Sequence, residues 1–140
     1  MKNIILIVVA AAAIYHFWGK YKEDELFKSS HSPNGFVEVV MPNGTKNNMV
    51  YVLAPINCPK EAGQRADAIE RELNLLGIPV ERSSNGSLNS QGNSVEEQKK
   101  FKRSVAIMKG EIPGVFVNGM AKENPAISEV VAEYKRTEKL

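Results

Sequence analysis

An uninterrupted apolar run near the N-terminus constrains this chain of 140 residues more than any other feature. Residues 4–15 read Ile-Ile-Leu-Ile-Val-Val-Ala-Ala-Ala-Ala-Ile-Tyr and contain no charged side chain. A helix made of these residues is apolar on all sides, whereas a helix packed on a soluble domain keeps a polar face. We therefore predict that this segment is not a core helix but enters a membrane.

The length of the segment suits a single membrane crossing. A bilayer core requires roughly 20 residues, with about 17 as the lower end. The run reaches that length if it continues to Tyr21 and the flanking lysines extend toward the headgroups. An interfacial aromatic belt would be formed by Tyr15, Phe17, Trp18 and Tyr21. We predict that residues 1–22 form an N-terminal anchor that contacts the membrane through residues 4–21.

A cleaved secretory signal is the alternative, because Ala11 and Ala13 form a small-residue pair at which cleavage is possible. The apolar stretch before that pair is short, and apolar residues continue beyond it, so an uncleaved anchor is favoured. The lysines on the two sides of the segment are nearly balanced. Since a very short N-terminal tail usually stays in the cytoplasm, we expect a single-pass protein of the inner (cell) membrane with its domain on the extracytoplasmic side. Cleavage would instead give a secreted protein.

Composition limits what the rest of the chain can be. Residues 23–35 are polar and suggest a linker, which leaves residues 36–140 for one domain. Lysine and arginine number 18 and aspartate and glutamate 16. The chain therefore lacks the strong basic excess that is typical of nucleic-acid-binding proteins. A single cysteine cannot form an internal disulfide. We predict no metal site, because ligand spacing is lacking and His16 and His31 lie outside the domain.

The first half of the domain shows a strand–helix–strand pattern. Residues 36–41 and 49–54 are two predicted strands, which we expect to pair antiparallel. Apolar residues recur at helical spacing over 58–76, and Gly77 follows as a C-terminal cap. Residues 78–82 form the next predicted strand. A strand, a helix and a strand within about 30 residues predict a βαβ unit with parallel strands.

The second half predicts a helix, a hairpin and a final helix. Residues 83–94 are small and polar, and we expect a mobile loop. Ser94 and Glu97 then have the spacing of a capping box for a helix to Lys109, with Phe101, Val105 and Met108 as its core face. Residues 115–117 and a short return strand flank Asn118-Gly119, which favours a tight hairpin turn. The last helix is expected to open with Asn124 as N-cap and Pro125 at the first helical position. Its apolar face is expected to consist of Ile127, Val130, Val131 and Tyr134.

The sole cysteine, Cys58, lies between the second predicted strand and the first helix of the domain. With Cys58 as N-cap, Pro59 and Lys60 occupy the first helical positions, and the free N–H groups of that turn favour a thiolate. Lys60 supports the thiolate, whereas Glu61 opposes it. Asn57 either donates a hydrogen bond near the sulfur or forms a turn. The alternative is a small, partly buried Cys58 that only packs.

Three stretches in this order resemble the glutaredoxin branch of the thioredoxin-like fold, over about residues 48–136. They are VYVLAPINCP (50–59), LNLLGIPVER (73–82) and EIPGVFVNG (111–119). The resemblance implies an α/β domain in which a mixed sheet is flanked by helices, here with an extra strand before it. It further implies that Pro113 is a cis-proline facing the cysteine, and that Pro113 and Gly114 present backbone to glutathione or an extended peptide.

The chain departs from that family at three places. Glu61 stands where the second cysteine would be, Met120–Pro125 replace the Gly-Gly-x-Asp stretch that holds glutathione, and the lysine before the cysteine is absent. A single thiol can still exchange with a disulfide when an external thiol completes the reaction. Glutathione is therefore an open cofactor, and no other is implied.

Three functions follow as hypotheses. The favoured one is a membrane-anchored monothiol oxidoreductase with Cys58 as nucleophile, acting on a thiol or protein substrate. Its binding residues would be Asn57, Pro59, Lys60, Pro113 and Gly114. The second is a catalytically inactive thioredoxin-fold module that binds a protein or peptide at the membrane through the sheet end or the 83–94 loop. The third is a structural protein of the cell envelope with Cys58 buried.

Overall fold

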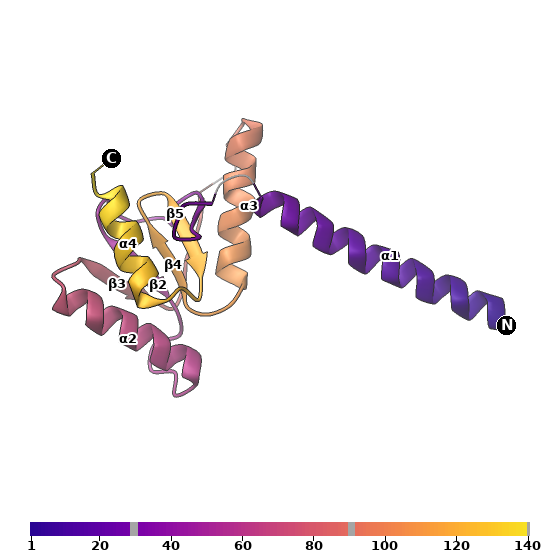
Figure 1. Ribbon diagram of the computed structural model, residues 1–140, viewed down its shortest axis with the longest axis horizontal. Coiled ribbons are helices and arrows are strands. Elements are labelled where there is room, and N and C mark those ends of the chain that lie inside the picture. Colours follow the sequence, from indigo (N-terminus) through magenta and orange to yellow (C-terminus); the bar gives the residue numbers. More distant parts are fainter. Residues whose placement is uncertain (29–30, 90–91, 140) are drawn as a thin grey trace.

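A computed structural model describes residues 1–28, 31–89 and 92–139 of the chain. A long helix, α1 (Lys2–Phe27), precedes a mixed α/β domain (Figure 1). Helix α1 is long and apolar enough to cross a membrane, and a signal sequence near the N-terminus has the same properties. The side chains of its apolar run, from Ile4 to Ile14, are exposed.

The domain is built on one five-stranded sheet in the order β1-β5-β4-β2-β3. Its strands are β1 (Val37–Glu38), β2 (Val50–Leu53), β3 (Val80–Ser83), β4 (Gly114–Val117) and β5 (Met120–Glu123). Strands β2 and β3 are parallel, as the strand–helix–strand pattern predicts, whereas all other neighbours are antiparallel. The sheet is therefore mixed.

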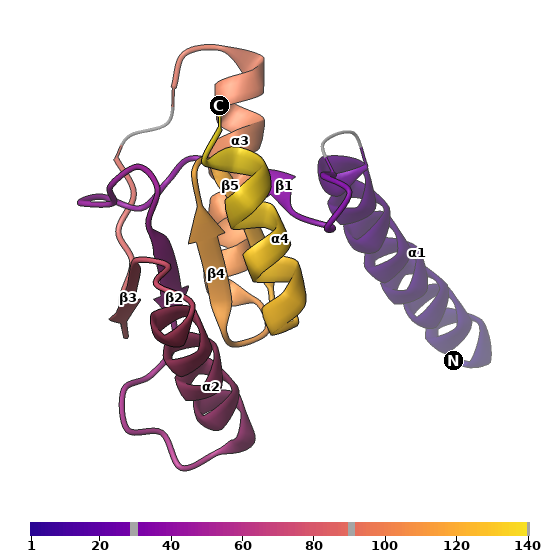
Figure 2. The same ribbon diagram turned by 60° about the vertical axis from the view of Figure 1, so that its left-hand side comes forward.

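Helices cover both faces of this sheet. Helix α2 (Glu61–Leu75) and helix α4 (Ile127–Thr137) pack on one face, where Ala66, Ile69, Leu73 and Val130 join the buried valines of β2 and β4. Helix α3 (Val95–Lys109) covers the other face, where Ile107 packs with Tyr51, Phe116 and Phe27. Figure 2 shows α4 in front of the sheet and α3 behind it. The valine-rich β2 and β4 are central and buried on both faces, as expected for such apolar strands.

The position of the first strand differs from the prediction. Strand β1 is short and pairs with β5 at the edge of the sheet, with Val37 opposite Ala121, and does not pair with the strand at 49–54. Both sides of β2 are occupied, by β3 and by β4. The predicted antiparallel pair is wrong because nearness in sequence does not decide which edge of a sheet is open.

Helix α2 begins later than the pattern of apolar residues predicts. Its N-cap is Lys60, whose backbone is extended, so Cys58 and Pro59 lie before the helix. The predicted end is confirmed: Gly77 has a φ of +69°, and the N–H groups of Gly77 and Ile78 donate to the carbonyls of Asn74 and Leu73. This pattern of two hydrogen bonds is a Schellman motif, which needs a left-handed residue after the helix.

Helix α3 has the predicted capping box but a different buried face. The Ser94 Oγ accepts a hydrogen bond from the N–H of Glu97 at 3.1 Å, and the Glu97 carboxylate accepts from the N–H of Ser94. Its fully buried residues are Arg103, Ser104 and Ile107, whereas Phe101, Val105 and Met108 are only half-buried. The apolar stripe was a poor guide here because α3 buries polar side chains toward the rest of the chain. Of the preceding loop, residues 90–91 lie outside the described residues.

The hairpin is confirmed, but the start of α4 is not where the sequence predicts it. Asn118 and Gly119 both have positive φ angles, as a primed turn between β4 and β5 requires. The N-cap of α4 is Ala126, whose N–H donates to the Glu129 carboxylate at 2.9 Å. Asn124 instead has a φ of +41° and lies in the bend that follows β5. The predicted apolar face of α4 packs on the sheet as expected.

Two buried charged residues hold α1 and the segment after it against the domain. Arg103 donates from Nε to the Leu26 carbonyl at 2.8 Å and from a terminal nitrogen to the Glu38 carbonyl at 3.2 Å. Glu133 accepts hydrogen bonds from Ser32 at 2.9 Å and from Asn34 at 2.8 Å. Five residues of the predicted linker, 23–27, are helical, and Ser32 and Asn34 belong to the domain. The segment is therefore not a free tether at either of its described ends.

Candidate functional site

Cys58 lies in an exposed loop at the carboxyl end of β2. Pro55, Ile56 and Asn57 are exposed and Cys58 is half-buried, in the turn between β2 and α2. Asn57 adopts a positive φ of 57°, a conformation that asparagine tolerates better than most residues, so its turn-forming role is supported. Cys58 is a free cysteine. Cys58 therefore lies partly at the surface rather than sealed in the core.

The first turn of α2 is built against the backbone of Cys58. Gly63 is buried, and a Cβ added there would lie 2.6 Å from the Cβ of Cys58 and closer still to its carbonyl oxygen. The Gln64 side chain donates to the Pro59 carbonyl at 3.2 Å. A glycine inside a helical pattern was the sequence signal for this close approach, although the apolar pattern alone did not single it out. The loop therefore follows the position of α2.

Glu61 does not occupy the position that the sequence suggests. Since Lys60 is the N-cap, Glu61 is the first residue of α2 and not the third. Its exposed carboxylate forms an ion pair with Arg65 at 3.0 Å, one helical turn away. This pairing supports a structural role for Glu61 and offsets its negative charge near the loop.

Pro113 and Gly114 begin the neighbouring strand at the same end of the sheet. The Ile112–Pro113 peptide bond is cis, as the resemblance implies, and both Pro113 and Gly114 are buried. Gly114 is opposite Leu53, the last residue of β2. Because β2 ends where β4 begins, the loop that carries Cys58 and the loop that carries Pro113 leave the sheet at the same end of these strands. This is the lower end of the sheet in Figure 2.

Arg65 connects α2 to the cis-proline loop. Its Nη2 donates to the Ile112 carbonyl at 3.2 Å, and its Nε donates to the Asn124 side chain at 2.9 Å. The N–H of Asn124 in turn donates to the Pro113 carbonyl at 2.8 Å. Sequence reasoning missed Arg65 and Asn124 because their partners are 47 and 59 residues from Arg65 in the chain. The first two turns of α2 therefore contact both loops, the Cys58 loop through Gly63 and the Pro113 loop through Arg65.

Two exposed apolar side chains lie at this end of the sheet. Ile56 precedes Cys58 and is 57% exposed, and Ile112 precedes Pro113 and is 38% exposed. Lys60 is exposed as the N-cap of α2, and Pro59 is exposed beside it. Cys58 therefore lies between apolar and basic surface. None of the most prominent hollows among the described residues lies at this site.

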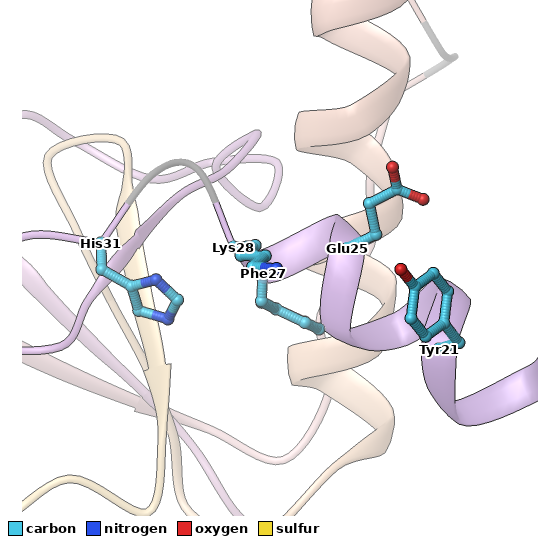
Figure 3. A pocket seen from close by; sticks show the side chains of 5 residues that line it. All are labelled: Tyr21, Glu25, Phe27, Lys28 and His31. Carbon is cyan, nitrogen blue, oxygen red and sulfur yellow. The ribbon is translucent and has the colours of Figure 1, made fainter. Parts of the chain in front are cut away.

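A prominent hollow lies elsewhere, where α1 meets the domain. It has a volume of about 600 Å³ and is lined by Tyr21, Glu25, Phe27, Lys28 and His31. Figure 3 shows the Glu25 carboxylate directed away from the His31 ring, so these groups do not converge on a common point. Among residues 1–28, 31–89 and 92–139, no group of three metal-binding side chains occurs. The hollow is a feature of the junction rather than a second reactive site.

Comparison of the chain with protein-family models, curated proteins and solved structures finds no significant match.

Proposed function

We propose that the chain is a single-pass membrane-anchored thiol–disulfide oxidoreductase of the monothiol, glutaredoxin-like type. The observation that carries the proposal is that the loop with the sole cysteine, Cys58, and the loop with Pro113 leave the sheet at the same end of the neighbouring strands β2 and β4. The strand order β3-β2-β4-β5, with helices on both faces, supports a thioredoxin-like domain to which β1 adds an edge strand. The apolar helix α1 supports the anchor.

The chemistry needs one thiol and two partners. The Cys58 thiolate attacks a substrate disulfide R–S–S–R′, so that a Cys58–S–S–R bond forms, the substrate S–S bond breaks, and R′–S⁻ leaves and takes a proton from water. The thiolate of an external thiol R″–SH, such as glutathione, then attacks the sulfur of R. This second exchange releases R–S–S–R″ and restores the Cys58 thiolate. Over the two steps the R–S group is transferred from R′–S to R″–S, and the protein ends the cycle unchanged.

The surroundings of Cys58 favour a peptide or protein disulfide as substrate. Ile56 and Ile112 provide exposed apolar surface on the two loops, which suits an apolar side chain next to the substrate cysteine. Glutathione is small and charged and offers nothing to these side chains. Lys60 and Pro59 complete the accessible surface next to the thiol. Glutathione is therefore better suited to the second step, in which it needs to reach only the mixed disulfide.

A binding module without turnover is the second candidate. Arg65 already donates to the Ile112 carbonyl at 3.2 Å, a backbone group that an extended peptide would need for pairing. Glu61 stands at the position of the resolving cysteine and is engaged by Arg65. The Arg65 contact has to open before a peptide can pair with this carbonyl, and a carboxylate at position 61 cannot resolve a mixed disulfide, so both observations count against turnover.

Adduct formation and turnover on the full chain in mild detergent distinguish the candidates. We expect the reduced protein to form one mixed disulfide with a cysteine-containing peptide disulfide, seen by intact-mass spectrometry, and to release it when glutathione is added. Cys58→Ser should form no adduct. If an unlabelled peptide binds Cys58→Ser as tightly as the parent chain and neither turns over a disulfide, the binding module is correct. If the folded protein forms no adduct and binds no peptide, both candidates are wrong.

A further inference from the structure

Helix α3 carries a stripe of lysines on the face that points away from the sheet. Lys99, Lys102 and Lys109, here called the lysine stripe, are all exposed. At 3.6 residues per turn their positions fall within an arc of about 80°. The other residues on this arc, Val95 and Ala106, are uncharged. The exposed face of α3 is therefore basic without an intervening carboxylate.

The acidic residues of α3 are directed to other partners. Glu96 pairs with the buried Arg103 at 3.4 Å, and Glu97 closes the capping box with Ser94. Lys100, which is outside the stripe, pairs with Glu38 at 3.0 Å. None of the stripe lysines forms an ion pair with any residue that the structure describes. Their charge is available to a partner outside the chain.

Positive charge is concentrated on this helix and not spread over the molecule. Residues 95–109 contain five basic and two acidic residues, a net charge of +3, whereas the whole chain has a net charge of +2. The remainder is thus −1. Residues 20–28, where α1 leaves its apolar run, hold three lysines and three acidic residues and contribute no net charge. The stripe is therefore the main attraction that this side of the domain offers to an anionic surface.

The structure directs the stripe toward the membrane that α1 would cross. The last turn of α1 docks on α3, since Arg103 donates to the Leu26 carbonyl and Phe27 packs with Ile107 and Met108. In Figure 1, α1 extends away from the sheet on the side of α3. The buried face of α3 is turned to β1 and β5, so its exposed face is the one directed outward, on the side on which α1 leaves.

The length of α1 sets the height of α3 above the bilayer. A hydrocarbon core of about 30 Å takes roughly 20 residues, so a crossing that starts at Lys2 ends near Tyr21. Leu26 follows five residues later, which at 1.5 Å per residue is about 7.5 Å along the axis. The headgroup layer on each side of the core is about 5–7.5 Å deep. Leu26, on which α3 docks, is therefore at the outer boundary of the headgroup layer, within reach of lysine side chains.

We propose that the lysine stripe binds anionic phospholipid headgroups of the membrane spanned by α1, so that α3 lies flat on the bilayer. The proposal rests on the membrane anchor of the proposed function and does not depend on the chemistry of Cys58. Each lysine near an anionic surface favours binding roughly fivefold, and three together about a hundredfold. Because the anchor is in the same membrane as the lipids, it keeps the lysine stripe at a high effective concentration of headgroups.

The test uses the full chain in nanodiscs of phosphatidylcholine alone or of phosphatidylcholine mixed with phosphatidylglycerol. A water-soluble acylating reagent is applied, and its rate at each lysine is followed by mass spectrometry. We expect the stripe lysines to react several-fold more slowly in the anionic discs, while Lys135 and Lys139 on the opposite side of the sheet keep their rates. High salt, at which the Debye length is about 3 Å, should remove the difference.

A variant pair tests whether the stripe itself holds the domain. A dye on Cys58 reports the freedom of the domain by fluorescence anisotropy. In anionic discs we expect the triple variant Lys99→Gln, Lys102→Gln, Lys109→Gln to lose the high anisotropy of the parent chain. The control Arg71→Gln, Lys135→Gln, Lys139→Gln removes the same charge from exposed positions on α2, on α4 and just beyond α4, and should keep it.

The outcomes separate this proposal from the anchor on which it rests. If the chain does not co-elute with either kind of disc, the anchor fails and the stripe proposal falls with it. If the chain co-elutes but the stripe lysines react alike in neutral and anionic discs, the anchor stands and the stripe proposal is overturned. Equal anisotropy of the two triple variants would also overturn it, as would protection of the stripe by an added polyanion but not by anionic lipid.

Discussion

The junction between α1 and the domain and the loop that carries Cys58 are held by different means. At the junction, Arg103 and Glu133 are fully buried and donate or accept hydrogen bonds across 77 and 101 residues of sequence. At the Cys58 loop, most residues are exposed, and the contacts come from Gly63 and from Arg65, whose side chain is 40% exposed. A buried charge tolerates little displacement because its partners cannot be replaced by water.

The two regions therefore serve different purposes in the molecule. The junction orients the domain on α1, so loss of a partner there should affect the whole fold. The loop presents a thiol to solvent, and its supports are local and partly hydrated, so changes there should alter reactivity more than stability. Four predictions test this contrast, from the largest expected effect to the smallest.

Removing the buried carboxylate should have the largest effect. Glu133→Ala leaves Ser32, Asn34 and Arg136 without their acceptor, and we expect the free energy of unfolding to fall by about 3 kcal/mol. Urea denaturation of the full chain in detergent, followed by far-UV circular dichroism, measures this loss. The control Glu138→Ala removes an exposed carboxylate near the end of α4 and should cost no more than about 0.5 kcal/mol. Equal stability of the two variants would contradict a structural role for the junction.

A steric change tests how tightly the loop is held to α2. Gly63→Ala places a Cβ against the carbonyl oxygen and Cβ of Cys58. We expect a loss of about 2 kcal/mol, although alanine is otherwise the better helix former. The matched control is Gly19→Ala in α1, where nothing lies within 4 Å of the added atom and no loss is expected. A Gly63→Ala protein as stable as its parent would show that the loop moves freely.

The pH dependence of stability reports the same carboxylate in its native state. Burial disfavours the charged form of Glu133, but hydrogen bonds from Arg136, Asn34 and Ser32 outweigh it and hold the pKa below its ordinary value of 4.5. The stabilisation is therefore present above that value and is lost as the pH falls through the lowered pKa of the folded state. We expect a smaller effect than that of truncation, because a protonated carboxyl still accepts hydrogen bonds.

Denaturation at a series of pH values below about 4.5 measures this effect. Glu133→Gln should flatten the fall without abolishing it, since the pKa values of Glu97 and Glu129 are also lowered. In Glu97 the cause is hydrogen bonding from Ser94, and in Glu129 it is hydrogen bonding from Lys122 and then Ala126. A variant that keeps the slope of the parent chain would assign the acid sensitivity to other carboxylates.

The smallest effect on stability is expected from Arg65→Gln. Because Arg65 is 40% exposed, its ion pair and hydrogen bonds together should stabilise the fold by no more than about 1 kcal/mol. The substitution frees the Ile112 carbonyl for an incoming peptide, so we expect the peptide disulfide to react with Cys58 several-fold faster. Stopped-flow or mass-spectrometric rates measure this, with Arg71→Gln as an exposed control on the same helix. A rate that is unchanged or lower would mean that Arg65 does not compete with the substrate.

Local signals predicted much of the secondary structure. The capping box at Ser94, the glycine after α2 and the Asn118–Gly119 turn each depend on residues within a few positions of one another, and all three are present. Predictions that depended on distant partners were less successful. Strand β1 pairs with β5 at the other side of the sheet, and Ala126 rather than Asn124 caps α4.

At the candidate site, too, local features were predicted from the sequence and contacts between distant residues were not. The sequence placed Cys58 after a strand and Pro113 before one, and both are found there. It did not predict that Cys58 lies before the helix, nor that Gly63 and Arg65 connect α2 to the two loops. A glycine within the helical pattern was the one visible hint of these contacts. The arginine looked like any other solvent-facing charge because its partners are far away in sequence.

Local sequence patterns were sufficient to predict an apolar helix of membrane-spanning length, two apolar strands, the capped helix α3 and the hairpin turn. Only the tertiary structure decided which strands are neighbours, which face of α3 is buried, and how α1 is joined to the domain. The physical reason is that hydrogen-bonding and apolar patterns act over a few residues, whereas the partners of Arg103, Glu133 and Arg65 are chosen by which surfaces meet when the sheet closes.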